Sequence, residues 1–408
     1  MGKQILGQAF LRDLGAVSVS EAVAGIAAFL YIMVVSRRLG VSDYGLFQAV
    51  MALFSILTIF VGPLNLATVH CVSVSDDPQK SAVVGSLVRF SFWIGIACAS
   101  LVVLLSSWLT GVLYGGIGPV ICVAVLVALT AVLTVFYGAW QAYGAYTAYA
   151  ITRIAESLIR LGVGSILVMA GTGASGAVLG YVLGTGSLLA LSFARTRFYS
   201  FSRGRFDVRS QLETFVGILS VYGTIFFVGD FPVVLARSRL GAEASGLYGA
   251  LYGLRTLVLP FCLASVAPLY ARTVGVSSGH KPFLQVLVPI LGLGGVFFLV
   301  GVFLPRLPFQ IIYGTAFVGA ARYMAGYGIA LSLQMVSIIT MFYQIAQKRL
   351  ERVYLLVPVL ILVTGAVWPG LSIPKLVLIQ VVAWALYLLI VLGSITVRKM
   401  SSTRAGGL

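Results

Sequence analysis

Residues 37–47 read RRLGVSDYGLF, and residues 239–248 read RLGAEASGLY, about 200 positions later in a chain of 408 residues. When Arg38 is aligned with Arg239, five further positions agree: two leucines, two glycines and a final aromatic residue, Phe47 against Tyr248. A match at half the length of the chain indicates that the chain consists of two similar halves.

The repeated stretch has the composition of a short polar turn between two membrane helices. In the first copy an apolar run, residues 17–35, precedes two arginines. Gly40 can end a helix in a left-handed conformation, and Ser42 or Asp43 can cap the helix that follows. The apolar pattern then resumes, so each copy predicts the tip of a helical hairpin.

The composition is that of a polytopic membrane protein. Hydrophobic residues make up 60% of the chain, charged residues 9%, and the mean hydropathy is +1.05. Ordinary soluble domains contain about 25% charged residues. The first residues, MGKQILGQAFLRDLG, lack a small-residue cleavage site after an apolar core, so we expect a mature cytoplasmic end rather than a signal peptide. The four cysteines lack CxxC spacing and are typical of small buried side chains.

Apolar runs near the 20 residues needed to cross a bilayer recur along the whole chain. The fold predicted is therefore an all-α polytopic membrane protein of about twelve transmembrane helices in two pseudo-symmetric six-helix lobes. Two such lobes can rock about a site near the membrane midplane and open it alternately to either side. The expected spans are residues 16–36, 44–69, 83–108, 115–138, 148–170, 174–194, 212–236, 244–270, 283–304, 318–343, 353–369 and 374–396.

The distribution of Lys and Arg predicts the orientation. With the N-terminus inside, about 17 basic residues fall on the cytoplasmic side and about six on the other, which places both termini in the cytoplasm. We expect an N-terminal lobe at 1–194, a basic cytoplasmic interlobe linker at 195–211, and a C-terminal lobe with a short tail at 212–408. The net charge of +16 is spread over membrane loops, so we expect lipid headgroups and not nucleic acid as its partner.

Three stretches resemble a known family. RRLGVSDYGLF after the first helix, Gly62-Pro63 at the end of the second, and IIYGTAFVGAARYM at 311–324 are similar to the polysaccharide transporter family. That family contains lipid-linked oligosaccharide and O-antigen-type flippases of the multidrug/oligosaccharidyl-lipid/polysaccharide superfamily. The resemblance covers most of the chain in helix number and repeat layout.

The resemblance implies a function in cell-surface polysaccharide biosynthesis. It implies that the chain flips a polyprenyl-pyrophosphate-linked oligosaccharide, or a related anionic glycolipid, from the cytoplasmic to the outer leaflet of the cell membrane by alternating access. It also implies a central cavity between the lobes, lined mainly by the first two helices of each half. No cofactor or metal is expected, with H⁺ or Na⁺ as the coupling ion. Expected partners are the lipid-linked glycan, membrane lipids, and a polysaccharide polymerase or glycosyltransferases.

Ionisable residues within the spans are the candidate site residues, because a charge at the bilayer centre costs at least about 2.5 kcal/mol. Arg255 lies deep in the eighth span and shares a helical face with Tyr252 and Tyr248. A guanidinium can grip a pyrophosphate in bidentate fashion while tyrosine rings stack on sugars. The alternative is that Arg255 pairs with an acid. Arg89 in the third span can line the cavity or extend to the headgroups, and we expect Arg322 to extend to them.

The acidic candidates are Glu21 and Asp230. Glu21 shares a polar stripe of the first span with a serine and a glycine, as cavity lining requires. Asp230 precedes Pro232 and can cap a broken helix. Alternatively, Glu21 or Asp230 exchanges a proton or binds Na⁺ to drive the lobes. On the fifth span Glu156 and Arg160 are four residues apart, with another arginine one turn earlier, and we expect them to pair on one face.

Breaks in the cavity-lining helices are candidate hinges. They are Gly62, Pro63, Pro260 and Pro268, although ordinary helix packing would explain them as well. No catalytic residue is expected, because signatures such as HExxH, GxSxG and a Walker loop are absent. Three alternatives remain open: a cation-coupled multidrug exporter of the same superfamily, a membrane polysaccharide polymerase or glycosyltransferase, and a non-transporting scaffold of polysaccharide assembly. An exporter of cationic drugs should have an acidic cavity, and an enzyme should have acids in a large outer loop.

Overall fold

The computed structural model describes residues 2–73, 75–195, 208–266, 269, 273, 281–347 and 352–405. Over these ranges the chain is helical and has no strand, so the all-α prediction is confirmed. The chain divides into two compact units, Met1–Leu219 and Ser220–Leu408.

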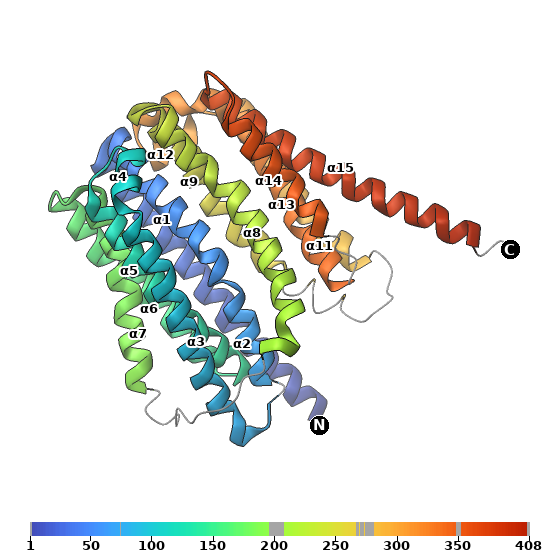
Figure 1. Ribbon diagram of the computed structural model, residues 1–408. Helices are drawn as coiled ribbons and strands as arrows, with labels where there is room; N and C mark the ends of the chain where they lie inside the picture. The colour runs from blue at the N-terminus through green and yellow to red at the C-terminus, as the bar shows by residue number, and fades with distance from the viewer. Residues whose placement is uncertain are drawn as a thin grey trace. The chain divides into compact units, whose positions relative to one another are not determined.

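The first unit begins with a long helix that is bent at a glycine. Its elements are α1 (Gly2–Leu57), the 3-10 helix η1 (Thr58–Phe60), α2 (Pro63–Ser73), α3 (Asp77–Leu104), α4 (Ser106–Leu113), α5 (Ile117–Ala142), α6 (Tyr146–Met169) and α7 (Gly173–Arg195). Helix α6 packs against α1 and α7, and α5 packs against α2, α3 and α7 (Figure 1).

The second unit is built around α13. Its elements are α8 (Val208–Arg239), of which the part from Ser220 belongs to this unit, α9 (Ala242–Ala264), α11 (Lys281–Phe303), α12 (Leu307–Ile312), η3 (Thr315–Tyr323), α13 (Met324–Ala346), α14 (Arg352–Ala366) and α15 (Ile373–Ala405). Helix α13 packs against α9, α11 and α15.

Each of the twelve expected spans overlaps a helix of the described residues, although the eighth, 244–270, extends beyond the end of α9 at Ala264 and partly outside the described ranges. Nine of the described helical stretches are long and apolar enough to cross a membrane, and the first of these, Val19–Ser73, covers the second expected span and nearly all of the first. Helix α6 falls outside this set because it carries three charged residues, and the apolar part of α14, Leu355–Ala366, is shorter than the rest. The chain is therefore a multi-pass membrane protein.

The aligned glycines of the repeat have the same backbone conformation in each unit. Gly40 bends α1 with φ 70° and ψ 178°, and Gly241 precedes α9 with φ 84° and ψ 174°. The φ angles are positive, as expected, but the ψ angles are not those of a left-handed helix. Helical geometry resumes directly after Gly40, so Ser42 and Asp43 lie inside the next turn. Their expected capping role is wrong, because the glycine itself occupies the position before the helix.

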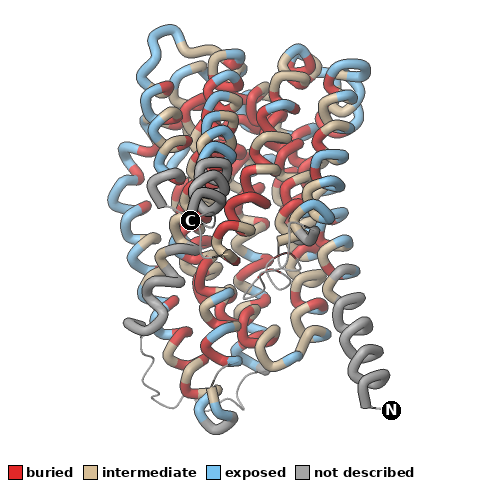
Figure 2. Tube along the Cα trace, turned by 90° about the vertical axis from the view of Figure 1, so that its right-hand side faces the viewer, coloured by how far each residue is buried: buried red, intermediate tan, exposed pale blue. Residues whose placement is uncertain are grey.

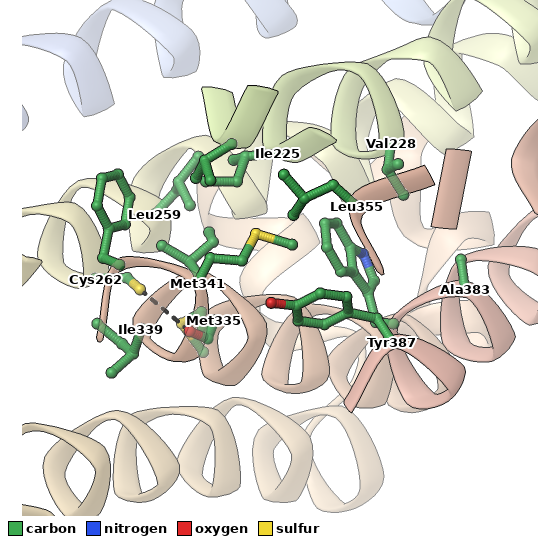
Figure 3. Packing of buried hydrophobic residues seen from close by; sticks show 14 of the residues in the cluster. Ile225, Val228, Leu259, Cys262, Met335, Ile339, Met341, Leu355, Ala383 and Tyr387 are labelled. Carbon is green, nitrogen blue, oxygen red and sulfur yellow. Dashed lines mark hydrogen bonds between the residues drawn. The ribbon is translucent and has the colours of Figure 1, made fainter. Parts of the chain in front are cut away.

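The core of the second unit is a cluster of apolar side chains from six helices. Figure 3 shows Met335, Ile339 and Met341 of α13 facing Leu259 and Cys262 of α9. The Cys262 thiol donates to the Met335 carbonyl oxygen at 3.6 Å. Side chains of α8, α11, α14 and α15 complete the cluster.

Large apolar side chains are also exposed along the helices. Figure 2 shows exposed and buried positions along the same helices. Trp93, Leu104, Val288 and Phe303 are among the exposed ones. Because large apolar side chains gain nothing from contact with water, this surface fits contact with lipid chains.

Candidate functional site

In the first unit Arg153 of α6 joins two carboxylates. Its Nε and Nη2 donate to the two Glu21 carboxylate oxygens at 3.2 and 3.4 Å, and its Nη1 donates to Glu156 Oε2 at 3.1 Å. Glu21 comes from α1, whereas Glu156 lies one turn after Arg153 on α6. The result is one cation between two acids.

Hydroxyl groups supply further donors to both carboxylates. Tyr149 donates to Glu21 Oε1 at 2.8 Å, Tyr137 donates to Glu156 Oε2 at 2.7 Å, and Thr185 donates to Glu156 Oε1 at 3.0 Å. The guanidinium carbon of Arg153 also lies 5.6 Å from the centre of the Tyr137 ring. The polar network therefore joins α1, α5, α6 and α7, which Figure 1 shows as neighbouring ribbons of the first unit.

The expected pair between Glu156 and Arg160 does not form. Tyr137 and Thr185 hold the Glu156 carboxylate, and Arg153 is the arginine that reaches it. The guanidinium of Arg160 lies over the Tyr181 ring, 4.6 Å from its centre, and its buried Nε has no hydrogen-bond partner. The i,i+4 spacing permitted the pair, but in the structure the carboxylate contacts Arg153 and two hydroxyl donors from α5 and α7.

In the second unit Arg255 of α9 forms an ion pair with Asp230 of α8. Arg255 Nη1 donates to Asp230 Oδ1, and Arg255 Nε donates to Gln334 Oε1 of α13 at 2.9 Å. The side chains of Arg255 and Asp230 are only 2% and 1% exposed. Helix α8 continues through Pro232, so the capping role considered for Asp230 is wrong, because its carboxylate faces an arginine instead.

Two tyrosines surround this buried ion pair. The Tyr252 ring lies 5.4 Å from the guanidinium carbon of Arg255. Tyr248 donates to Gln380 Oε1 of α15 at 2.8 Å and packs edge-on against Tyr327. The substrate-binding role of Arg255, Tyr252 and Tyr248 stays a prediction, since in this structure all three side chains are buried.

The remaining candidates lie apart from these two networks. Arg89 is exposed on α3 and donates to Ser86 Oγ at 3.3 Å. Gly62 lies between η1 and α2, Pro63 begins α2, and Pro260 lies inside α9. Pro268 lies outside the described residues, as does most of the basic segment 195–211. The hinge roles stay predictions.

Sequence reasoning did not assign site roles to the hydroxyl and amide partners. Tyr137, Tyr149 and Thr185 complete the first network, and Gln334 and Gln380 complete the second. The amides carried a usable signal, because a glutamine within an apolar span needs a partner. Within the described ranges, no group of three or more His, Cys, Asp or Glu side chains could hold a metal ion.

Comparison with known proteins identifies the family and the fold. The family described as polysaccharide biosynthesis protein matches residues 10–273, well over half of the chain. A search among curated proteins finds no significant match. Several solved membrane transporters have a similar fold over nearly the whole chain.

One of them is an inward-facing multidrug resistance MATE family transporter of the MOP superfamily, with a TM-score of 0.67 and 14% identity, covering 95% of this chain and 99% of that one. The lipid II flippase MurJ in an inward closed conformation gives 0.65 and 16%, covering 93% and 87%. A MOP superfamily transporter from Pyrococcus furiosus Vc1, for which a binding pocket of reverse polarity suggests a different function, gives 0.61 and 16%, covering 96% of each chain.

At such identities the likeness shows a shared fold, and function must be argued from the site. The family match extends from α1 to residue 273 and includes both copies of the repeated turn. The chain therefore belongs to the polysaccharide biosynthesis protein family.

Proposed function

We propose that the chain flips a polyprenyl-pyrophosphate-linked oligosaccharide, or a related anionic glycolipid, from the cytoplasmic to the outer leaflet. The family match over residues 10–273 carries this proposal. The fold agrees with it, since a lipid II flippase has a similar fold. The proteins of similar fold named above are transporters and a flippase, which supports transport over polymerisation or glycosyl transfer.

The balance of charge within the membrane helices also supports an anionic substrate. Within the described residues the carboxylates of Glu21, Glu156 and Asp230 all pair with arginines. Arg89 and Arg160 are different, because neither has a carboxylate within ion-pair distance in the same ranges. Arg89 and Arg160 are therefore positive charges without a neighbouring carboxylate among the described residues, and positive charge attracts phosphate.

The proposed mechanism is alternating access between the two lobes expected at 1–194 and 212–408. The segment 195–211 would join them on the cytoplasmic side of the cell membrane, where both termini would also lie. A glycosyltransferase would supply the lipid-linked glycan, and a polymerase would use it after transfer. Glu21 or Asp230 would exchange H⁺ or Na⁺ to drive the motion.

A cation-coupled exporter is the second candidate, because a MATE family transporter has a similar fold. It would prefer cationic amphiphiles and therefore needs carboxylates that are open to them. Asp230 is buried against Arg255, and Glu21 and Glu156 both contact Arg153, so each of these carboxylates already has an arginine beside it, which disfavours a cationic ligand.

A transport assay in proteoliposomes tests the choice. A fluorescent polyprenyl-pyrophosphate oligosaccharide is expected to reach the opposite leaflet only in vesicles that contain the protein, and faster with a proton or Na⁺ gradient. Arg89→Gln is expected to slow the movement about tenfold. Arg322 is exposed and its guanidinium lies over the Tyr323 ring, so Arg322→Gln is the control and should not change the rate. Export of a cationic dye without movement of any lipid-linked glycan would identify the exporter instead.

A further inference from the structure

Three donors converge on the carboxylate of Glu21. They are Nε and Nη2 of Arg153 and the hydroxyl of Tyr149, at 3.2, 3.4 and 2.8 Å from its oxygens. Tyr149 and Arg153 are four residues apart on α6, so one helix presents all three donors on one face. In this arrangement two nitrogens of one guanidinium donate to two oxygens of one carboxylate, and arginine binds phosphate with the same bidentate geometry.

The occupant of this donor set comes from a different helix. Glu21 lies on α1, and its side chain is 40% exposed, whereas the Glu156 side chain is 15% exposed. The Glu156 carboxylate also accepts hydrogen bonds from the hydroxyls of Tyr137 and Thr185. It accepts a further one from Arg153 Nη1, the guanidinium nitrogen that does not contact Glu21. Departure of Glu21 would therefore leave Arg153 held in place by Glu156, with two guanidinium donors open to another oxyanion.

The position of the donors along α6 fits the phosphate of a membrane lipid. Helix α6 begins at Tyr146. Tyr149 and Arg153 lie three and seven residues further on, which places them about 5 and 10 Å from this end along the helix axis. In the orientation proposed above, this end of α6 faces the cytoplasm. The Arg153 side chain is 31% exposed, and a guanidinium exposed at this depth needs water or an anion beside it.

We propose that Tyr149 and Arg153 form a binding site for the phosphate or pyrophosphate of the transported lipid, and that Glu21 occupies this site in its absence. The substrate phosphate displaces the Glu21 carboxylate from Arg153, while Glu156 holds the guanidinium in place. This inference rests on the proposed function and deepens it, because it assigns the anionic group of the substrate to named donors.

A binding measurement with four variants tests the site. Labelled undecaprenyl pyrophosphate is titrated against the full-length protein in detergent micelles. Arg153→Gln should weaken binding more than tenfold and Tyr149→Phe about threefold, because each removes donors to the phosphate. Glu21→Gln should strengthen binding about tenfold, because the competing carboxylate is gone. Arg322→Gln, at an exposed arginine of the second unit, is the matched control and should bind as the wild type does.

The sign of the Glu21→Gln effect separates a binding site from a structural ion pair. If Glu21→Gln weakens binding as Arg153→Gln does, the pair is structural and the proposal is wrong. Thermal unfolding of each variant checks that it is folded. Should Arg153→Gln fail to fold, Arg153→Lys keeps the charge without the bidentate geometry and should still weaken binding.

Competitors identify the source of the phosphate. Inorganic pyrophosphate in excess is expected to displace the labelled lipid, because the donors recognise the phosphate itself. Displacement by phosphatidylglycerol but not by pyrophosphate would assign the site to a bulk lipid and contradict the proposal. If the wild-type protein does not bind undecaprenyl pyrophosphate, the proposed function is wrong. If the wild-type protein binds it and none of the substitutions changes the affinity, only the proposed site on α6 is wrong.

Discussion

The ion pairs of the two units differ in how far they are exposed. Arg255 and Asp230 are almost completely buried, and Gln334 holds the guanidinium from a third helix. Arg153 and Glu21 are about one third exposed. A buried pair resists exchange, since removing one partner leaves an unpaired charge in a medium of low dielectric constant. An exposed pair can exchange its anion for another.

Removing one member of the buried pair is expected to be more damaging than removing both. Asp230→Leu should lower the free energy of unfolding by about 3–5 kcal/mol, because Arg255 stays buried without a counter-charge. The double variant Asp230→Leu/Arg255→Met should recover most of this loss. Thermal unfolding of the purified protein measures both. If the loss of the double variant equalled the sum of the losses of Asp230→Leu and Arg255→Met, each measured alone, the two side chains would not interact.

Gly229 is adjacent to the same pair, and its lack of a side chain gives the pair its space. A Cβ at this position would meet the ends of the Arg255 and Gln334 side chains. We expect Gly229→Ala to break the hydrogen bond between them and to destabilise the protein by about 1–3 kcal/mol. Gly292→Ala is the matched control in α11, where a Cβ would meet nothing within 4 Å. Equal unfolding temperatures of the two variants would contradict this account.

At the scale of the element, the repeated turn depends on one backbone conformation. Gly40 and Gly241 combine a positive φ with a ψ near 180°, a region that is essentially restricted to glycine. Neither position is crowded, since a Cβ on either glycine would meet nothing within 4 Å. Glycine is thus required at both turns by the backbone and not by packing.

Alanine at either turn should therefore have a similar cost. Gly40→Ala and Gly241→Ala are each expected to destabilise the protein by about 1–3 kcal/mol through backbone strain. Gly25→Ala, at a helical site of α1 where a Cβ also has open space, should be neutral or slightly stabilising. Chemical denaturation followed by tryptophan fluorescence compares the three. No difference between Gly40→Ala and Gly25→Ala would remove the backbone explanation.

At the scale of the whole molecule, the fold was readable from the sequence because a bilayer imposes helix length and apolarity. The all-α class and the approximate positions of the described helices followed from apolar runs and their punctuation. The partners of the charged residues did not follow. Spacing on α6 allowed Glu156 to pair with either neighbouring arginine, and it does not reveal that Arg153 and hydroxyls from α5 and α7 are the actual partners. The partner of Arg255 lies 25 residues away on another helix, at a distance that periodicity does not determine.

Ion coupling is also a property of the whole transporter. If Glu21 carries the coupling ion, Glu21→Gln protein should still equilibrate the labelled lipid between leaflets, but at a rate that no longer responds to a proton or Na⁺ gradient. The amide cannot exchange a proton or bind a cation as a carboxylate does. Proteoliposomes with and without the gradient provide the measurement. A variant that keeps the response of the wild type would leave Asp230 as the coupling candidate.

The sequence separations of the ion pairs have a consequence for biosynthesis. Asp230 and Arg255 are 25 residues apart on consecutive helices, so the two charges can leave the translocon already paired within one hairpin of α8 and α9. Glu21 is synthesised 132 residues before Arg153, and four further helices, α2 to α5, emerge before its partner does. During that interval α1 must keep its carboxylate in water, in the translocon or beside a chaperone, because lipid does not solvate it. Insertion of α6 therefore supplies the ion-pair partner of Glu21 and allows α1 to settle in its final position in the membrane.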